Sequence, residues 1–212
     1  MQRFWNLVLA LVVAATVVAQ LFLLVNGGQD VNTTAAAAPV PLATRLLRFF
    51  SYFTVQSNLL VLVAAISLVI RPDRDGTLWR VLRLDALLGI AVTGVVFATL
   101  LAGLVHPSGI GIWINAGFHH FSPVWTLLGW LALGPRPRID ARTIRWAFVW
   151  PVAWLVYTMV HGAISGWYPY PFLDADTLGY GRVGLTIAVI LAAALATAFA
   201  FQAIDRRLPP TG

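Results

Sequence analysis

The side chains able to do acid–base or nucleophilic chemistry are few in this chain, and two of them are adjacent histidines, His119 and His120, in the stretch "WINAGFHHF". The chain has no cysteine, so the candidate nucleophiles are serine and threonine hydroxyls, which need a neighbouring base. A neutral histidine is the natural base near neutral pH. Thr54 with His119 would form a minimal nucleophile and base, although spacing alone does not decide between Thr54 and Ser57 or between His119 and His120.

Helical spacing groups these side chains with other polar ones. Residues three, four or seven positions apart share one face of a helix, because the helix has about 3.6 residues per turn. Three such polar stripes occur: Ser51, Thr54 and Asn58; Asn115 and His119; and Tyr157, His161 and Ser165. The amides of Asn58 or Asn115 could stabilise an oxyanion, while His120, His161 and Tyr157 could orient the base or bind substrate.

The histidines also permit a metal site as an alternative. Nitrogen and oxygen ligands for zinc could come from a set of scattered residues: His106, His119, His120 and His161, with Asp174 or Asp176. Their spacing is wider than metal-binding motifs normally show, so the sequence assigns neither a metal nor another cofactor.

The composition indicates which elements hold these side chains. The chain is 59% hydrophobic and 10% charged, with a mean hydropathy of +0.82, whereas soluble domains carry roughly 25% charged residues. Each of six apolar segments is near the ~20 residues that cross a hydrocarbon core. The first lacks a clear small-residue cleavage site and is expected to be a retained helix. We expect an all-α polytopic membrane protein in which residues 1–212 form a single six-helix integral domain, with spans at about 4–25, 49–70, 84–105, 116–133, 144–164 and 182–204.

The arginines orient this bundle. They cluster before the first span, between the second and third, between the fourth and fifth, and after the sixth. The positive-inside rule places these loops and both termini in the cytoplasm, as in a multi-pass protein of the cell membrane. The pI near 10.8 then reflects membrane topology and not a nucleic acid partner. All four histidines fall at the outer face, and Asp85, at the inner end of the third span, is expected to pair with Arg80 or Arg83.

Three segments carry a family resemblance. They are "YFTVQSNLL", "WINAGFHHFSPVW" and "MVHGAISGWYPYPFL". Together they resemble the androgen-induced-gene-type membrane hydrolases, a family of small six-helix proteins of similar length that includes bacterial members. The family's animal members act as threonine hydrolases on fatty acid esters of hydroxy fatty acids, and the resemblance places the nucleophile on Thr54 and the catalytic histidine on His119. Two positions differ, since Ala116 stands where the animal proteins have a histidine, and His120 where they have threonine.

The polar stripes and the resemblance together predict a membrane-embedded hydrolase of lipid esters. A membrane lipid or lipid-like ester would reach such a site from the bilayer, where loss of water contact strengthens local electrostatics. The alternatives are a non-catalytic membrane protein that binds a lipid, a small molecule or a partner, and the histidine metal site. Only hydrolysis requires the Thr54 hydroxyl, and the sequence does not indicate an oligomeric state.

Overall fold

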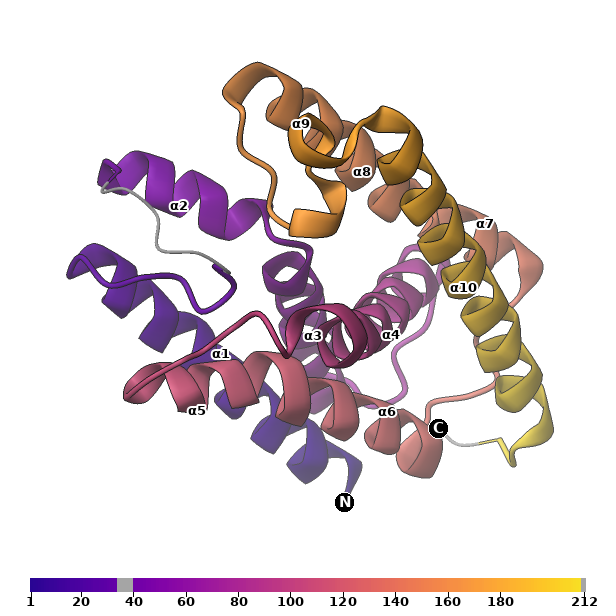
Figure 1. The fold of residues 1–212 in the computed structure, drawn as a ribbon. Coiled ribbons are helices and arrows are strands. Elements are labelled where there is room, and N and C mark those ends of the chain that lie inside the picture. Colours follow the sequence, from indigo (N-terminus) through magenta and orange to yellow (C-terminus); the bar gives the residue numbers. More distant parts are fainter. Residues whose placement is uncertain (34–39, 211–212) are drawn as a thin grey trace.

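The fold is described by a computed structural model that covers residues 1–33 and 40–210 (Figure 1). It is 78% helical and has no β-strand in these residues, so the all-α expectation is confirmed. The longer helices are α1 Gln2–Val25, α2 Leu42–Ser51, α3 Phe53–Ile70, α4 Thr77–Val96, α6 Ser122–Leu133, α8 Val149–Ser165 and α10 Tyr180–Arg207. The shorter elements are the π-helices η1 Phe97–Leu101 and η2 Gly117–Phe121, the 3₁₀ turn η3 Pro171–Leu173, and the helices α5 Ile110–Ala116, α7 Ala141–Ala147 and α9 Ala175–Leu178.

Several helices have the length and apolarity of membrane spans. Within the described chain there are five such stretches: Gln2–Val25, Phe53–Ile70, Thr77–Leu101, Ala141–Ser165 and Tyr180–Arg207. They match the first, second, third, fifth and sixth expected spans. The expected fourth span lies in α5, η2 and α6, which run without a break from Ile110 to Leu133. This stretch carries Asn115, His119 and His120 and is not among the five, so a sixth span stays a prediction.

The expected second span, 49–70, is wrong at its start. Tyr52 adopts an extended conformation, with φ −67° and ψ 129°, and this residue separates α2 from α3. α2 is a short helix of its own, and the guanidinium of Arg48 lies 5.1 Å from the ring centre of Trp167. Ser51 therefore does not continue the stripe of Thr54 and Asn58, and Thr54 falls in the first turn of α3.

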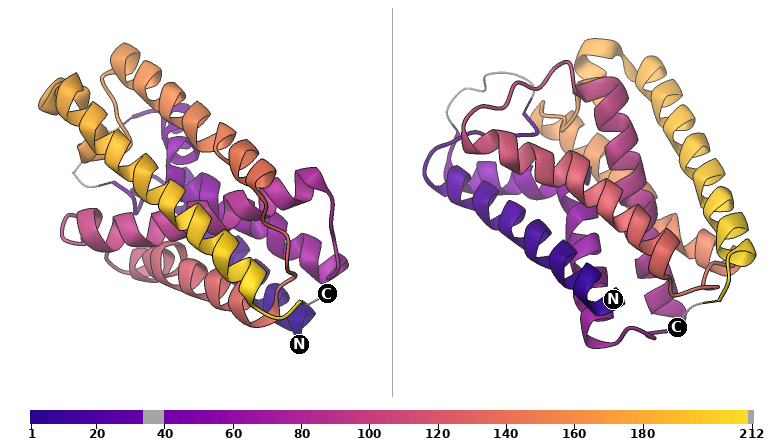
Figure 2. Two further views of the ribbon diagram at one scale, coloured as in Figure 1. Left: turned by 90° about the vertical axis from the view of Figure 1, so that its right-hand side faces the viewer. Right: turned by 90° about the horizontal axis from the view of Figure 1, so that it is seen from below.

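The best-packed part of the molecule is formed by α1, α3, α4 and the continuous stretch α5–η2–α6. The indoles of Trp5 and Trp125 stack with ring centres 4.0 Å apart, and each indole N–H donates to the backbone carbonyl of the other residue. A Cβ at Gly117 or Gly129 would overlap Thr16 or Trp5, so these glycines let α1 approach closely, as small residues do between membrane helices. α10 packs on the outside of this group (Figures 1 and 2).

The arginine-rich segments meet at one end of the molecule. Arg80 bonds to Asp75 at 2.6 Å and lies 4.0 Å from Asp140, while Arg138 lies 3.4 Å from Asp75. The Arg80 guanidinium holds the pKa of Asp75 well below its usual range. Asp205, near the end of α10, accepts hydrogen bonds from two backbone N–H groups of the same cluster, including that of Arg138. The start of α1 and the end of α10 lie at this end too (Figure 2).

Candidate active site

Thr54 is held in the first turn of α3, where backbone N–H groups have no partner within the helix. The N–H groups of Val55 and Gln56 both bond to the carbonyl of Tyr52, at 3.1 Å. The N–H of Thr54 instead donates to the hydroxyl of Tyr170, also at 3.1 Å. A helix N-terminus carries partial positive charge, which favours negative charge that develops on an oxygen at this position. Thr54 is buried, so this effect is weakly screened by solvent.

The hydroxyl of Thr54 faces the imidazole of His119. Thr54 Oγ1 lies 3.5 Å from His119 Nε2, at the long end of hydrogen-bond range. Catalytic hydrogen bonds are often this long in the absence of substrate. The pair therefore meets as the sequence led us to expect, whereas Ser57, the other candidate hydroxyl, has no hydrogen-bond partner among the described residues. Geometry thus selects Thr54 and His119 from the alternatives that spacing left open.

Asn115 sets the tautomer of the histidine. Its Oδ1 lies 2.9 Å from His119 Nδ1, across one turn of the helix. An amide oxygen only accepts, so Nδ1 carries the proton and donates it to Asn115. The lone pair of Nε2 is then directed at Thr54, which is the arrangement that a general base requires. Asn115 acts on the imidazole, and not on an oxyanion as one of the sequence-based options had it.

The two π-helices bring a further ring against His119. Phe97, the first residue of η1, stacks on the imidazole of His119, in η2, with ring centres 4.0 Å apart and planes 16° from parallel. π-turns occur frequently at functional sites, because the extra residue in the turn redirects a side chain. Pro123 lacks an N–H, which would leave the Phe118 carbonyl of η2 without a helical partner. The amide of Asn58 donates to that carbonyl, at 3.4 Å.

Tyr170 also contacts Thr54, and the spacing of residues in the sequence did not predict this contact. Its hydroxyl lies 3.2 Å from Thr54 Oγ1, and it accepts the hydrogen bond of the Thr54 N–H. Burial raises the pKa of Tyr170 to about 12, so the phenol keeps its proton at neutral pH. One consistent assignment is that Tyr170 donates to Thr54 Oγ1 and that Thr54 donates to His119 Nε2. Tyr170 is the first residue of the Tyr-Pro-Phe-Leu that closes "MVHGAISGWYPYPFL", a motif that could have pointed to it but had no role assigned from the sequence.

The other expected site residues lie apart from this set. The amide nitrogen of Asn58 donates to the carbonyls of Thr54 and Phe118, which leaves no free amide hydrogen for an oxyanion. His120 is exposed and touches only the edge of Phe97 among the aromatic rings of the described chain.

Tyr157 and His161 form a separate polar group on α8. The hydroxyl of Tyr157 lies 2.6 Å from that of Ser51, and the ring of His161 stacks against Tyr157. Ser165 Oγ lies 3.4 Å from His161 Nδ1 and donates to the His161 carbonyl. No hydrogen bond links this group to Thr54 or His119 in the described part of the chain, so its expected role beside the base has no geometric support.

The candidate metal ligands named from the sequence do not lie close together in the structure. Across residues 1–33 and 40–210 there is no group of three or more histidine, aspartate or glutamate side chains placed to hold a metal ion. His106 lines a different, polar pocket beside Asp30. The geometry therefore favours the hydroxyl–imidazole pair over a metal centre as the reactive group.

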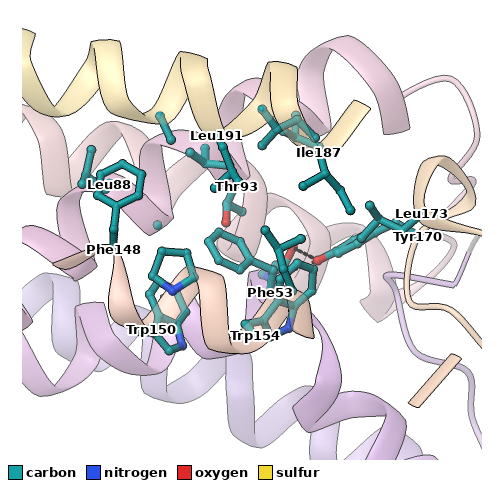
Figure 3. Close-up of a pocket in the computed structure, with 18 of the residues that line it drawn as sticks. Phe53, Leu88, Thr93, Phe148, Trp150, Trp154, Tyr170, Leu173, Ile187 and Leu191 are labelled. Atoms are coloured by element: carbon teal, nitrogen blue, oxygen red, sulfur yellow. Dashed lines mark hydrogen bonds between the residues drawn. The ribbon is translucent and has the colours of Figure 1, made fainter. Parts of the chain in front are cut away.

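Thr54 and Tyr170 line one wall of an apolar pocket between α4, α8 and α10 (Figure 3). The pocket has about 840 Å³ of empty volume, its open side included. Trp150 and Trp154 form one wall, and Ile187 and Leu191 of α10 face them from the other side. Thr54 thus borders a cavity suited to an apolar chain.

Comparison of the chain with protein-family models, with curated proteins and with solved structures finds no significant match. The functional assignment therefore rests on the geometry of the site and on the three segments quoted above.

Proposed function

We propose that this protein is a membrane-embedded hydrolase of lipid esters, with Thr54 as the nucleophile and His119 as the general base. The observation that carries the proposal is the chain of contacts from Asn115 through His119 to Thr54, which ends at the wall of an apolar pocket. The arrangement is similar to the catalytic triad of a serine or cysteine hydrolase, in which the nucleophile contacts a base and a third group orients that base.

The geometry supports a two-step reaction. Thr54 Oγ1 attacks the ester carbonyl carbon while His119 Nε2 takes the hydroxyl proton, and His119 then returns this proton to the leaving alcohol. Water hydrolyses the resulting acyl-threonine with the same base, which gives the carboxylic acid and regenerates Thr54. Tyr170 is the nearest side-chain donor to the oxyanion formed in each step, because its hydroxyl already lies 3.2 Å from Thr54 Oγ1. Asn115 is a positioning residue that acts through His119.

The substrate is a long-chain ester, and the family resemblance points to fatty acid esters of hydroxy fatty acids. The pocket wall is built from tryptophan, phenylalanine, leucine and isoleucine side chains, which bind an acyl chain without polar competition. The pocket lies among helices of membrane length, so the substrate enters from the lipid phase.

The proposed setting is the cell membrane, with six crossings and both termini in the cytoplasm. The continuous helix from Ile110 to Leu133 is the additional crossing, and the gathering of Arg80, Arg138 and their partners at one end supports the sidedness. Thr54 and His119 then lie near the outer face.

The test is ester turnover by the purified protein and three variants: Thr54→Ala, His119→Ala and the double variant. We expect each single change to lower kcat by about 10²- to 10⁴-fold, and the double change to cost little more, because the two residues act as one unit. Ser57→Ala is the matched control, since it removes a buried hydroxyl one turn further along the same helix. A fluorophosphonate probe should label Thr54 in the wild type.

Two results would contradict the proposal. Full activity in Thr54→Ala would show that this hydroxyl is not the nucleophile. Additive losses in the double variant would show that Thr54 and His119 act separately.

A further inference from the structure

Asp85 is a buried carboxyl group that the proposed chemistry does not use. It lies two turns into α4, and its side chain is 7% exposed. Neither of its oxygens has a hydrogen-bond partner among the described residues, and Oδ1 is fully enclosed. The expected pairing with Arg80 or Arg83 is wrong. Arg80 binds Asp75, and Arg83 donates to the carbonyl of Gly134, since residues two apart on a helix face different sides.

Asp85 lines the same pocket as Thr54, toward the start of α4. Both Asp85 and Val96 line it from α4, and these two residues are eleven positions apart, which corresponds to about 16 Å of helix. Leu88, Gly89 and Val92 line the stretch between, which is apolar except for Thr93. Figure 3 shows the length of the pocket, with Leu88 and Phe148 at one end and Tyr170 at the other.

A carboxyl group without a partner inside a membrane-length helix is costly, and such groups commonly mark binding or transport sites. A ligand that occupies the pocket would supply the hydrogen-bonding partner that Asp85 lacks. A hydroxyl group suits a carboxyl in either protonation state, because it donates to a carboxylate and both donates to and accepts from a neutral acid.

We propose that Asp85 binds a hydroxyl group at the far end of the acyl chain whose ester carbonyl lies at Thr54. This inference rests on the proposed function and narrows its substrate class to esters of long-chain ω-hydroxy acids. An extended carbon chain with bonds of about 1.5 Å and angles near 111° advances about 1.25 Å per bond. The stretch of α4 that lines the pocket, about 16 Å long, therefore corresponds to an extended chain of about 12 or 13 bonds.

The experiment measures binding without turnover. Methyl dodecanoate and its ω-hydroxy derivative are titrated into the purified Thr54→Ala variant, and binding is followed by the fluorescence of Trp150 and Trp154 in the pocket wall. We expect the hydroxy ester to bind about tenfold more tightly, which is the effect of one hydrogen bond to a buried carboxyl. In Thr54→Ala combined with Asp85→Leu, the ratio of the two affinities should fall to about one.

Two further variants keep the test decisive. Asp85→Asn retains hydrogen-bonding atoms at the same place and should keep part of the preference, which covers the case in which Asp85→Leu fails to fold. Thr93→Val removes a buried hydroxyl from the middle of the pocket and should leave the ratio of the two affinities unchanged.

Equal affinities in Thr54→Ala, or a preference that survives Asp85→Leu, would overturn the role of Asp85 while leaving the hydrolase proposal intact. Absence of ester turnover in the wild type together with an intact hydroxyl preference would overturn hydrolysis and leave the binding site. The two proposals therefore fail in distinguishable ways.

Discussion

Replacement of Tyr170 by phenylalanine tests the site most sharply, because it removes one oxygen and keeps the ring. The ring of Tyr170 stacks on Phe172 at 5.2 Å and meets Tyr52 edge-on at 5.6 Å, contacts that phenylalanine preserves. The lost hydroxyl is the acceptor for the Thr54 N–H and the nearest donor to Thr54 Oγ1. Tyr170→Phe therefore separates a role in the reaction from a role in packing.

Two magnitudes follow from this geometry. Loss of one oxyanion donor lowers kcat by about 10²- to 10³-fold, which corresponds to about 2.7–4 kcal/mol in the transition state. The Thr54 N–H would also lose its partner in a buried setting, which costs about 1–3 kcal/mol of stability. We expect the effect to fall on kcat and not on KM, because the hydroxyl acts on charge that exists only during the reaction.

The assay compares kcat, KM and thermal stability of the wild type, Tyr170→Phe and a control, Tyr168→Phe. Tyr168 lies in the same loop, and its hydroxyl has no hydrogen-bond partner in the part of the chain that the structure describes. Since the pKa of Tyr170 is raised to about 12, wild-type kcat should not fall near pH ~10, where an unperturbed tyrosine loses its proton. A kcat for Tyr170→Phe within about threefold of the wild type would refute the donor role.

Three other predictions concern the base, the outer loop and the topology. Asn115→Ala should lower kcat by at least about tenfold with little change in KM, because the acceptor that fixes the His119 tautomer is lost. Asn115→Asp should recover part of the lost activity. Equal activity in the wild type and both variants would show that the bond between Asn115 and His119 has no role. Burial raises the pKa of Asp30 to about 6, so the native state holds its proton more tightly than the unfolded chain and wild-type stability falls as pH rises from about 4 to 6. Asp30→Asn removes this fall, and its gain in free energy of unfolding over the wild type should be larger at pH ~7 than at pH ~4, by up to about 3 kcal/mol; an equal gain at both pH values would contradict the assignment. Because the chain has no cysteine, single cysteines at exposed Asp73 and Gln29 should react with an impermeant maleimide from opposite sides of the membrane, and labelling from one side would exclude the proposed topology.

Local patterns in the sequence predicted the helices and part of the site. Apolar runs of membrane length correspond to helices of the structure, since a segment in lipid must satisfy its backbone hydrogen bonds internally. Asn115 and His119, which are four residues apart, are in direct contact in the structure, even though His119 lies in a π-turn. Thr54, at the start of α3, and His119, in η2, are in contact, and the arginine pattern had placed both residues on the same side.

The contacts between distant segments could not be predicted in the same way. Thr54 and Tyr170 are 116 residues apart, and Tyr170 sits in a loop with no periodic pattern to orient it. The break at Tyr52 carries no proline or glycine, so an apolar stretch was read as one continuous span. Asp85 was assigned a nearby arginine because its position along the chain does not reveal which side of the helix it faces. Periodicity shows which residues share one face of a helix, but it does not show which segment packs against that face.

For the proposed hydrolysis, the way α10 is attached has a consequence for how turnover depends on substrate concentration. α10 is fixed at one end through Asp205 and at the other beside η3 and α9, and of its residues only Val183, Ala198 and Asp205 are buried. Its middle, residues 187–194, both contributes to the wall of the pocket and lies at the surface of the helix bundle, which faces lipid in the proposed setting. Substrate and product would exchange with the bilayer past this helix without passing through water. Turnover would then saturate with the mole fraction of ester in the membrane, so adding inert phospholipid at constant total ester would slow the reaction by dilution within the membrane.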